Sequence, residues 1–498
     1  MPNVITRRSF ISRSTFAAVM ASFASVPLFV QRALAEGQIG LNGKKILFIF
    51  LRGANDGINT VIPIQDSAYA TARPTIGLMK DSDPTVLYDA TAGTADVVAA
   101  TYPYAIRLGN GFAALHPALY KLSSVYNDGN LALVHRVAYP RQSRSHFDSQ
   151  NYWENGVPNN NSLREGVLYR AMYEGINASP DVVGKRSLTA VSVQSTMPLM
   201  IRGKVPMTNL SSVGRYNLLG VYSTDRSKHT NAIAAANQTI HPDKDNRDLI
   251  YGLGNQFKET LDIFQNQVFL SNEYYDPADT ASRLFPANDG FYTNLKTAAQ
   301  ILAQTDAVVA GTQLDGFDTH TAQGAATGSQ ANLLKRVGGG IYALQQYFKT
   351  YGRGGPQAVP GAKADWNDVI VVTLSEFGRT TDENSSLGTD HAEASVMFVA
   401  GGAINHGVYG CDTNINGVTG QQNWIPGVAA AGGSMYGAGG RYLKRLTDFR
   451  SVLGEIIRKH LGASDSQIAR IIPGYAAEAT EHLRSGNAGG ITGEVGLL

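Results

Sequence analysis

The clearest pattern in the chain is a set of short apolar runs separated by longer polar or amphipathic stretches. The first run, residues 45–51, is almost continuously apolar and ends just before Gly53. A strand of a parallel sheet is covered on both faces, so it shows an unbroken apolar run instead of an alternating pattern. Five further runs have the same character: residues 131–137, 188–193, 307–312, 369–374 and 395–400. We expect these runs to be strands of one sheet.

Helical periodicity occurs between several of these runs, in residues 114–127, 291–305 and 332–351. The alternation of strands and helices predicts an α/β fold, with a mostly parallel central sheet and helices on both faces. Three consecutive glycines, residues 338–340, lie inside the third helical pattern. Because each glycine costs about 1 kcal/mol relative to alanine in a helix interior, we expect this helix to pack closely against the sheet there.

The remaining segments set the domain limits. Residues 155–288 are irregular, polar and poor in strong strands, and we interpret them as an insertion or cap over the sheet. Residues 447–457 predict a helix with an N-cap at its first residues. The Gly-rich residues 485–498 predict a flexible tail. Residues 36–484 are therefore expected to form a single α/β domain.

The amino-terminal segment has the order of parts found in a secretory signal peptide. Thr6-Arg7-Arg8-Ser9-Phe10-Ile11 precedes an uncharged stretch, residues 14–31, and then Ala33-Leu34-Ala35. The paired arginines indicate a twin-arginine signal over residues 1–35, cleaved after Ala35 by a route that uses the Tat export machinery. The alternative is an N-terminal amphipathic or membrane-anchor helix, and the short, serine-containing stretch disfavours a permanent span. We expect a periplasmic or secreted protein.

Composition narrows the class of protein. The chain has 498 residues, of which 43% are apolar, enough for a large core. The net charge is +2, and removal of the four arginines of the predicted signal leaves the rest slightly acidic. The mature part has no long basic run, so a nucleic acid is not an expected partner. It also has no run near the roughly 18 apolar residues of a membrane span. Cys411 is the single cysteine, which excludes an intramolecular disulfide and a zinc site of several cysteines.

Four turns carry residues that can ligate or react with a substrate. They are Gly53-Ala54-Asn55-Asp56-Gly57, Asp315-Gly316-Phe317-Asp318-Thr319-His320, Ser375-Glu376-Phe377-Gly378-Arg379 and Gly388-Thr389-Asp390-His391. At least three of them follow predicted strands. In an open parallel sheet, ligands bind beyond the carboxyl ends of the strands, where such turns converge. We therefore expect the four turns to meet at one edge of the sheet.

Carboxylates and imidazoles together favour a divalent metal. The expected ligands are Asp56, Asp318, His320, Glu376, Asp390 and His391. Zn²⁺ is the first choice for this set, with Mn²⁺, Mg²⁺ or Ca²⁺ as alternatives. Since neighbouring Asp390 and His391 can serve two ions, or one ion and an outer hydrogen bond, one or two ions are expected.

Each of these residues also has a purely structural interpretation. Asp56 lies between Asn55 and Gly57 and can be a turn residue. Glu376 can pair with Arg379, Asp318 can cap a helix, and the histidines can be loop residues with satisfied hydrogen bonds. If there were no metal site, all of these structural interpretations would have to be true at once. The metal site is favoured because it does not need this coincidence.

A further candidate is Ser145 in Arg144-Ser145-His146-Phe147-Asp148, which follows the predicted strand 131–137. A serine at a helix start can be an N-cap, or it can be a nucleophile that a metal and the helix dipole activate. An anionic substrate would need cations beside it, and Arg144 and Arg379 are the candidates.

Several of these motifs resemble the DUF1501 family. They are Phe48-Ile49-Phe50-Leu51-Arg52-Gly53-Ala54-Asn55-Asp56-Gly57, Arg144-Ser145-His146-Phe147, Leu374-Ser375-Glu376-Phe377-Gly378-Arg379-Thr380, Glu383-Asn384 and Gly388-Thr389-Asp390-His391. The resemblance covers nearly all of residues 44–460. The family is bacterial, often exported by the twin-arginine route, and grouped with the alkaline phosphatase and sulfatase superfamily.

That relation implies an alkaline phosphatase-like sheet, with Asp56 as a first-strand ligand and Ser145 as the nucleophile. It also implies Asp318, His320, Asp390 and His391 as later ligands. The superfamily commonly has an Asp-His pair where this chain has Glu376-Phe377. Phe377 cannot ligate a metal, so either one ion or a rearranged second site is implied.

Two functions of different classes follow from these observations. The first is an exported metal-dependent hydrolase of phosphate or sulfate esters, with an anionic small molecule or polymer as substrate. The second is an exported binding or assembly protein that keeps the fold and has lost catalysis, which the position of Phe377 suggests. A formylglycine sulfatase is disfavoured because neither Cys411 nor Ser145 lies in the sequence that this modification needs.

Overall fold

The computed structural model describes most of the chain after the predicted signal peptide. The described residues are 38–64, 67–78, 104–108, 113–179, 186, 188–212, 222–239, 257–264, 272–409, 441–443, 445–475, 482–486 and 492–498. The predicted signal peptide, residues 1–35, and Cys411 lie outside the described residues.

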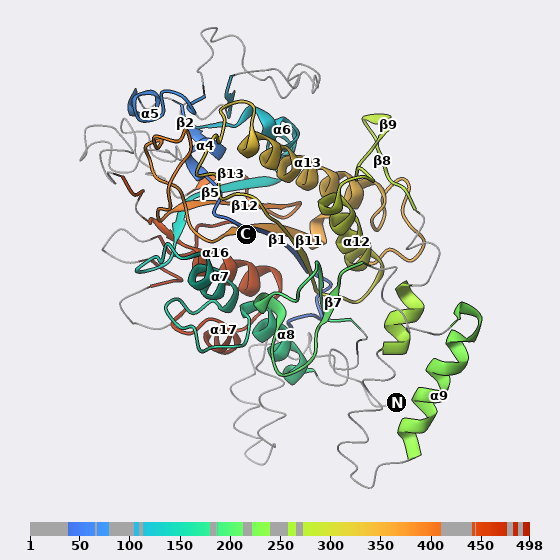
Figure 1. The fold of residues 1–498 in the computed structure, drawn as a ribbon. Helices are drawn as coiled ribbons and strands as arrows, with labels where there is room; N and C mark the ends of the chain where they lie inside the picture. Colours follow the sequence, from blue (N-terminus) through green and yellow to red (C-terminus); the bar gives the residue numbers. More distant parts are fainter. Residues whose placement is uncertain are drawn as a thin grey trace, which may run out of the picture.

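A central sheet of nine strands organises the described part of the chain (Figure 1). Its order is β13-β5-β12-β11-β1-β10-β6-β7, and β14 pairs with β5 at one end. The strands are β1 (Lys45–Leu51), β5 (Leu131–Ala138), β6 (Ala190–Val193), β7 (Thr208–Leu210), β10 (Val309–Leu314), β11 (Val369–Ser375), β12 (Ser395–Gly401), β13 (Gly407–Tyr409) and β14 (Thr447–Asp448). All six apolar runs identified in the sequence contribute a strand, so the prediction of one mostly parallel sheet is confirmed.

One strand of this sheet runs against the others. Strand β1 is parallel to β10 and β11, and the parallel pairing continues through β6 to β7. Strand β12 is antiparallel to both β11 and β5, so β5 again points the same way as β11. The carboxyl ends of β1, β5, β10 and β11 therefore share one edge with the start of β12.

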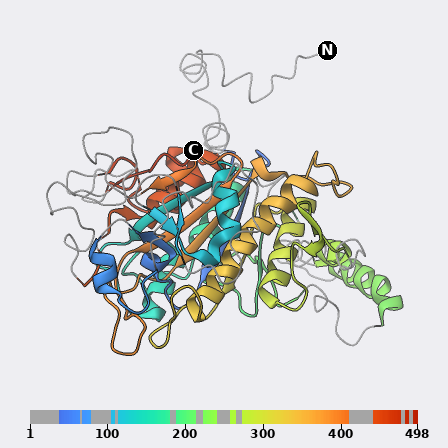
Figure 2. The ribbon, with the colours of Figure 1, turned by 90° about the horizontal axis from the view of Figure 1, so that it is seen from above.

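Helices cover both faces of the sheet (Figures 1 and 2). One face packs against α6 (Tyr120–Asn127), α12 (Gly290–Gln304) and α13 (Ser329–Thr350). The other packs against α7 (His146–Asn155), α8 (Val167–Ala178), α16 (Phe449–Glu455) and α17 (Asp465–Ile471). Alternate residues of β1 enter the two cores, because successive side chains of a strand point to opposite faces. Burial on both faces is the physical reason for the unbroken apolar run in the sequence.

The glycines of α13 allow a close approach to other helices. A Cβ added at Gly338 would lie 3.0 Å from a side-chain carbon of Leu119, and one at Gly340 would lie 2.6 Å from a side-chain carbon of Leu295 on α12. The close packing expected from these glycines is therefore present, but its partners are α12 and the turn before α6 instead of the sheet.

The segment interpreted as an insertion contributes to the domain itself. Strands β6 and β7 extend the central sheet beyond β10, and α8 covers one of its faces. Strand β6 lies in the predicted run 188–193, whereas β7 has three residues and leaves little pattern in the sequence. Helix α9 (Arg226–Thr239), in contrast, projects from the body of the molecule in both views (Figures 1 and 2).

The carboxyl-terminal residues pack against the domain where the sequence suggests a flexible tail. Glu494 accepts hydrogen bonds from Arg458 at 2.8 and 2.5 Å, and Leu497 is fully buried. The backbone of Asn405 donates to Leu497 O at 2.8 Å. Glycines in residues 485–498 therefore do not imply disorder in residues 492–498, because long-range hydrogen bonds hold that end.

Smaller elements surround the sheet. A three-stranded sheet consists of β2, β3 and β4, and a two-stranded ribbon consists of β8 and β9. The bounds are α4 (Gly57–Thr60), β2 (Val61–Pro63), α5 (Ser67–Ala72), β3 (Ile106–Arg107), β4 (Ala113–Leu115), β8 (Tyr275–Asp276), β9 (Asp279–Arg283) and a π-helix (Ile456–His460) that continues α16. Asp448 caps α16 through a hydrogen bond from the backbone N–H of Arg450, as the sequence predicts.

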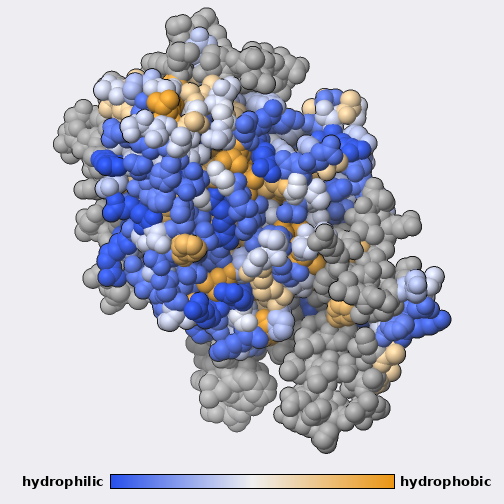
Figure 3. All heavy atoms as spheres, in the orientation of Figure 1, coloured by the Kyte–Doolittle hydropathy of each residue, from blue (hydrophilic) through white to orange (hydrophobic). Residues whose placement is uncertain are grey.

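The surface seen in Figure 3 is mostly hydrophilic, with apolar residues in small, separated spots. Among the described residues, none of the helices combines the length and the apolar character that crossing a bilayer requires.

Candidate metal centre

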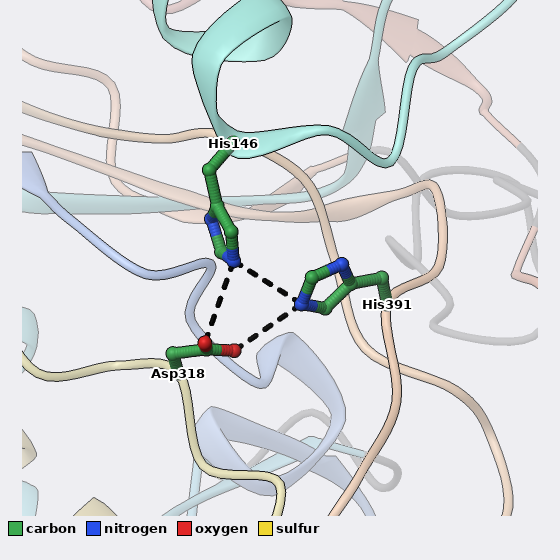
Figure 4. A group of neighbouring side chains, drawn as sticks. All are labelled: His146, Asp318 and His391. Atoms are coloured by element: carbon green, nitrogen blue, oxygen red, sulfur yellow. Dashed lines mark hydrogen bonds and ion pairs between the residues drawn. The ribbon is translucent and has the colours of Figure 1, made fainter.

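Histidine and carboxylate side chains meet at the carboxyl edge of the sheet. His146 is the first residue of α7, Asp318 follows β10, and His391 lies in the loop between β11 and β12 (Figure 4). One ligand atom from each of these residues lies within 4.8 Å of the others. The topology brings them together because β5, β10 and β11 end at the same edge.

Four side-chain donors converge when His320 is included. The Nε2 atom of His391 lies 3.1 Å from Nε2 of His146, 2.9 Å from Nε2 of His320 and 3.2 Å from Oδ1 of Asp318. Asp318 Oδ1 lies 3.1 Å from His320 Nε2, and its Oδ2 lies 3.5 Å from His146 Nε2. Ligands at about 2.0–2.1 Å from a tetrahedral zinc ion are about 3.4 Å apart. His146, His391 and Asp318 therefore have the spacing of a metal coordination shell, and His320 contacts two of these three donors.

The outer nitrogen of each histidine has an acceptor as its partner. His146 Nδ1 donates to Glu376 Oε2, His320 Nδ1 lies 3.3 Å from Asp390 Oδ1, and His391 Nδ1 lies 2.9 Å from the backbone oxygen of Arg144. Asp318 also faces the Nε2 side of all three rings, and a neutral imidazole has one proton, which cannot serve an acceptor on both sides. A cation on the Nε2 side, with the protons on Nδ1, would satisfy both sides. This is the arrangement by which outer hydrogen bonds orient histidine ligands of metals.

The charges also suit metal binding at neutral pH. Partial burial opposes ionisation of Asp318, but the Arg379 guanidinium lowers the pKa of this carboxyl to about 2. Burial lowers the pKa of His391 below its ordinary value, and the nearby Arg379 charge acts in the same direction. An ionised carboxylate and a neutral imidazole are the forms that bind a metal.

Glu376 and Asp390 lie behind the histidines instead of among the converging donors. Glu376 is fully buried, and its oxygens accept hydrogen bonds from His146, from the backbone N–H of Gly53 at 3.0 Å and from Gln150 at 2.7 Å. Asp390 accepts from Asn384 at 3.0 Å and from Arg441 at 2.8 Å, besides its contact with His320. Both carboxylates therefore contact the outer nitrogens of two histidines, and the structure does not place these predicted ligands among the converging donors.

Asp56 lies in a different, fully buried network. Its carboxylate caps α4 and pairs with Arg73 at 2.6 Å, and Gln323 donates to it at 2.7 Å. Burial opposes ionisation of Asp56, but the charge and hydrogen bonds of Arg73 hold the pKa of this carboxyl below its usual value. These contacts occupy both oxygens, so the structure does not place Asp56 among the converging donors.

Arg379 connects the loops that carry the centre. Its fully buried guanidinium donates to backbone oxygens that follow β1 and β10 and to Thr389 O at 3.1 Å, and it contacts Asp318 Oδ1 at 2.6 Å. With these partners it positions Asp318, and it does not present a free edge to a substrate. Arg144 is an exposed cation at this edge, and its guanidinium lies 4.6 Å from the centre of the Tyr442 ring.

Ser145 is the N-cap of α7. Its Oγ accepts from the backbone N–H of Asp148 at 3.4 Å, which is the structural role expected as one alternative. It directly precedes the donor His146 and lies at the same helix start. Phe377, in contrast, is fully buried, and its ring centre lies 4.9 Å from that of His146 and 4.7 Å from that of His391. It forms an apolar wall behind two of the donors.

Sequence reasoning did not identify His146 as a donor. The signal was present in the Arg144-Ser145-His146-Phe147 motif, because a helix start after a strand at this edge points into the same space as the other turns. The reactive residue expected in this motif is Ser145, whereas the residue among the donors is His146 beside it.

The fold and this site define an α/β protein with a histidine and aspartate cluster at the carboxyl edge of its sheet. The model of the family described as "Protein of unknown function (DUF1501)" matches residues 43–423, and the chain belongs to this family. Neither a curated protein nor a solved structure matches the chain.

Proposed function

We propose that the chain is an exported metal-dependent hydrolase of phosphate or sulfate esters, with an alkaline phosphatase-like fold. The observation that carries the proposal is the convergence of three imidazole Nε2 atoms on Asp318, with each Nδ1 bonded to an acceptor. A neutral imidazole has no second proton for its Nε2 side, where neighbouring nitrogens lie 2.9–3.1 Å apart, and a cation there would serve these nitrogens and Asp318 together. The paired Arg7 and Arg8 support export by the twin-arginine route.

The donor set favours one Zn²⁺ ion. His146, His391 and Asp318 would hold it, with His320 as a further donor. Three imidazoles and one carboxylate suit zinc better than Mg²⁺ or Ca²⁺, which prefer oxygen ligands. When bound, the ion would act as a Lewis acid that polarises the ester and lowers the pKa of a hydroxyl. Glu376 and Asp390 would hold His146 and His320 in the required tautomer.

The surroundings suit an anionic ester. The guanidinium groups of Arg144 and Arg441 both lie near the Tyr442 ring, at 4.6 and 5.8 Å from its centre. Exposed guanidinium groups recognise phosphate and sulfate oxygens. Ser145 stays a candidate nucleophile because its hydroxyl stands at the start of α7, next to His146.

Metal removal tests the proposal. Purified mature protein is expected to contain about one equivalent of zinc and to hydrolyse an aryl phosphate or aryl sulfate. Dialysis against a chelator should abolish turnover, and added Zn²⁺ should restore it. Absence of both bound metal and turnover in the reconstituted protein would refute the proposal. Stoichiometric metal without turnover would identify the alternative, a binding or assembly protein with a structural metal.

The role of Ser145 can be separated from its helix cap by a matched pair of variants. Ser145→Ala should cost about 1 kcal/mol of stability through the lost cap, and as a nucleophile variant it should lose at least about 100-fold in turnover. Ser464→Ala removes the equivalent serine cap of α17, remote from the site, and should lose only stability. Denaturant melts and initial rates of both variants provide the measurement. Unchanged turnover in Ser145→Ala would reduce Ser145 to a cap and leave water as the nucleophile.

A further inference from the structure

A polar cleft opens at the same edge of the sheet, at the carboxyl ends of β6 and β10. It has a volume of about 330 Å³, within the usual range of small-ligand sites. Its lining includes Gln194, Phe291, Asn294, Gln313, Asp315 and Arg336. Gln194 directly follows β6, and Asp315 directly follows β10. Asp315 shares the loop of Asp318, so the cleft and the metal centre are joined by one loop.

Hydrogen bonds fix the orientation of two amides in this cleft. The Asp315 carboxylate accepts from Gln313 Nε2 at 3.0 and 3.2 Å. The Oε1 atom of Gln313 therefore faces the other way, where it accepts from Arg52 at 3.2 Å and from Gln194 Nε2 at 3.2 Å. Gln194 Nε2 also donates to Thr196 O at 2.8 Å. If the Gln194 amide were flipped, its oxygen would face two other acceptors, Gln313 Oε1 and Thr196 O. The Oε1 atom of Gln194 must therefore face away from these two oxygens.

Two of the described residues that line the cleft each carry one polar atom without a hydrogen-bond partner. Among the described residues, Gln194 Oε1 and Arg336 Nε are buried atoms without a hydrogen-bond partner. Gln194 is only 5% exposed, while Arg336 is held in place through Nη2, which donates to Asp289 at 2.8 Å. A buried polar atom without a partner costs free energy, and a bound polar molecule can offset that cost.

The chemistry of the lining selects the ligand. A hydroxyl group both donates and accepts, so neighbouring hydroxyls can satisfy Gln194 Oε1 and Arg336 Nε together. The Asp315 carboxylate disfavours an anion, and the Arg336 guanidinium disfavours a cation. Phe291 and Leu314 add apolar surface for the carbon face of a ring. We propose that this cleft binds an uncharged polyhydroxylated ligand, such as a sugar residue. The proposal does not depend on metal binding or hydrolysis.

The proposal is tested by binding measurements on the mature protein. Glucose, galactose, mannose, N-acetylglucosamine, maltose and cellobiose are the probes, measured by saturation-transfer NMR and titration calorimetry. At least one of them should bind, and Gln194→Leu should weaken that binding about tenfold or more through the lost hydrogen bond. Gln346→Leu, a partly buried glutamine on α13 outside the cleft, is the matched control and should leave the affinity unchanged.

Two results would overturn the proposal. The first is the absence of binding by every probe, which would mean that water alone satisfies the cleft. The second is binding with equal affinity in Gln194→Leu, which would place the sugar elsewhere. Thermal melting checks that the variant folds, and Asn294→Ala, at a partly buried position of the lining, provides the same test if it does not. Titration of inorganic phosphate should produce no heat from the cleft and the same signal in wild type and Gln194→Leu.

Discussion

Replacing Asp318 with asparagine should lower the affinity for zinc at least about 100-fold while the protein remains folded. Asp318 is the only carboxylate among the four converging donors described, and its charge balances the cation. The substitution keeps the shape of the side chain, and its amide oxygen can still accept from Arg379, which now contacts Asp318 at 2.6 Å. Turnover should be lost together with the metal.

The measurement is a competitive chelator titration, with metal content determined on the same samples. Asp315→Asn is the matched control, because it removes a carboxylate from the same loop without touching the four donors. Its zinc affinity should equal that of the wild type. Equal affinities in Asp318→Asn and wild type would show that Asp318 is not a ligand of the zinc.

Replacing Asp56 with asparagine should destabilise the fold by about 3–5 kcal/mol and leave the metal content unchanged. The Asp56 carboxylate and the Arg73 guanidinium are both fully buried, at 2.6 Å from each other. The variant leaves the Arg73 cation without its counter-charge, and the new amide group faces the Arg73 and Gln323 donors. A role for Asp56 as a metal ligand predicts the opposite result, with metal lost and a small change in stability.

Denaturant unfolding and metal analysis together decide between these outcomes. Asp289→Asn is the control, since Asp289 also caps a helix and pairs with an arginine, Arg336, at 2.8 Å, but both side chains are partly exposed. It should cost no more than about 1–2 kcal/mol, for a cap and an exposed ion pair.

The effect of Asp56→Asn should also depend on pH in a defined direction. Burial alone would raise the pKa of Asp56 in the folded state, but the charge and hydrogen bonds of Arg73 outweigh burial, so the pKa is lowered. The stabilisation is therefore fully present above the unfolded pKa of about 3.9 and is lost as the pH falls through the folded value. Unfolding free energies of variant and wild type should differ by a constant amount from about pH 7 to pH 5 and converge in strong acid.

The sheet was predictable from the sequence because its strands are buried on both faces. Residues such as Ile46 and Leu47 are apolar at consecutive positions since they enter different cores, and this leaves a visible run. Strand β6 was predicted from the run 188–193, whereas β7 has only three residues, so its apolar pattern is too short to be recognised. Strand direction was not predictable, because the apolar run of β12 is the same whether it pairs parallel or antiparallel.

The location of the site was predictable from the sequence, whereas the partners of its individual residues were less so. Strand ends located Asp318, His320 and His391 near one another, because the edge of a parallel sheet gathers its loops. The sequence shows that a residue carries a carboxylate, but it does not show whether this carboxylate will bind a metal, pair with an arginine or accept a hydrogen bond from a histidine. In the structure, Asp56 pairs with Arg73, and Glu376 pairs with His146. These partners come from distant segments, and only the packed fold selects them.

The antiparallel direction of β12 has a consequence for how the centre can vary. The chain leaves β11 at Ser375 and re-enters the sheet at Ser395 on the same edge, without a crossover helix. Residues 376–394 therefore contribute Glu376 and His391 to the centre as one hairpin-like excursion, whose closure entropy grows only slowly with its length. Insertions or deletions between Thr381 and Gly388 can change the length of this excursion without shifting the register of a single strand. We expect the excursion to vary in length among members of the family, while the sheet beneath it stays constant.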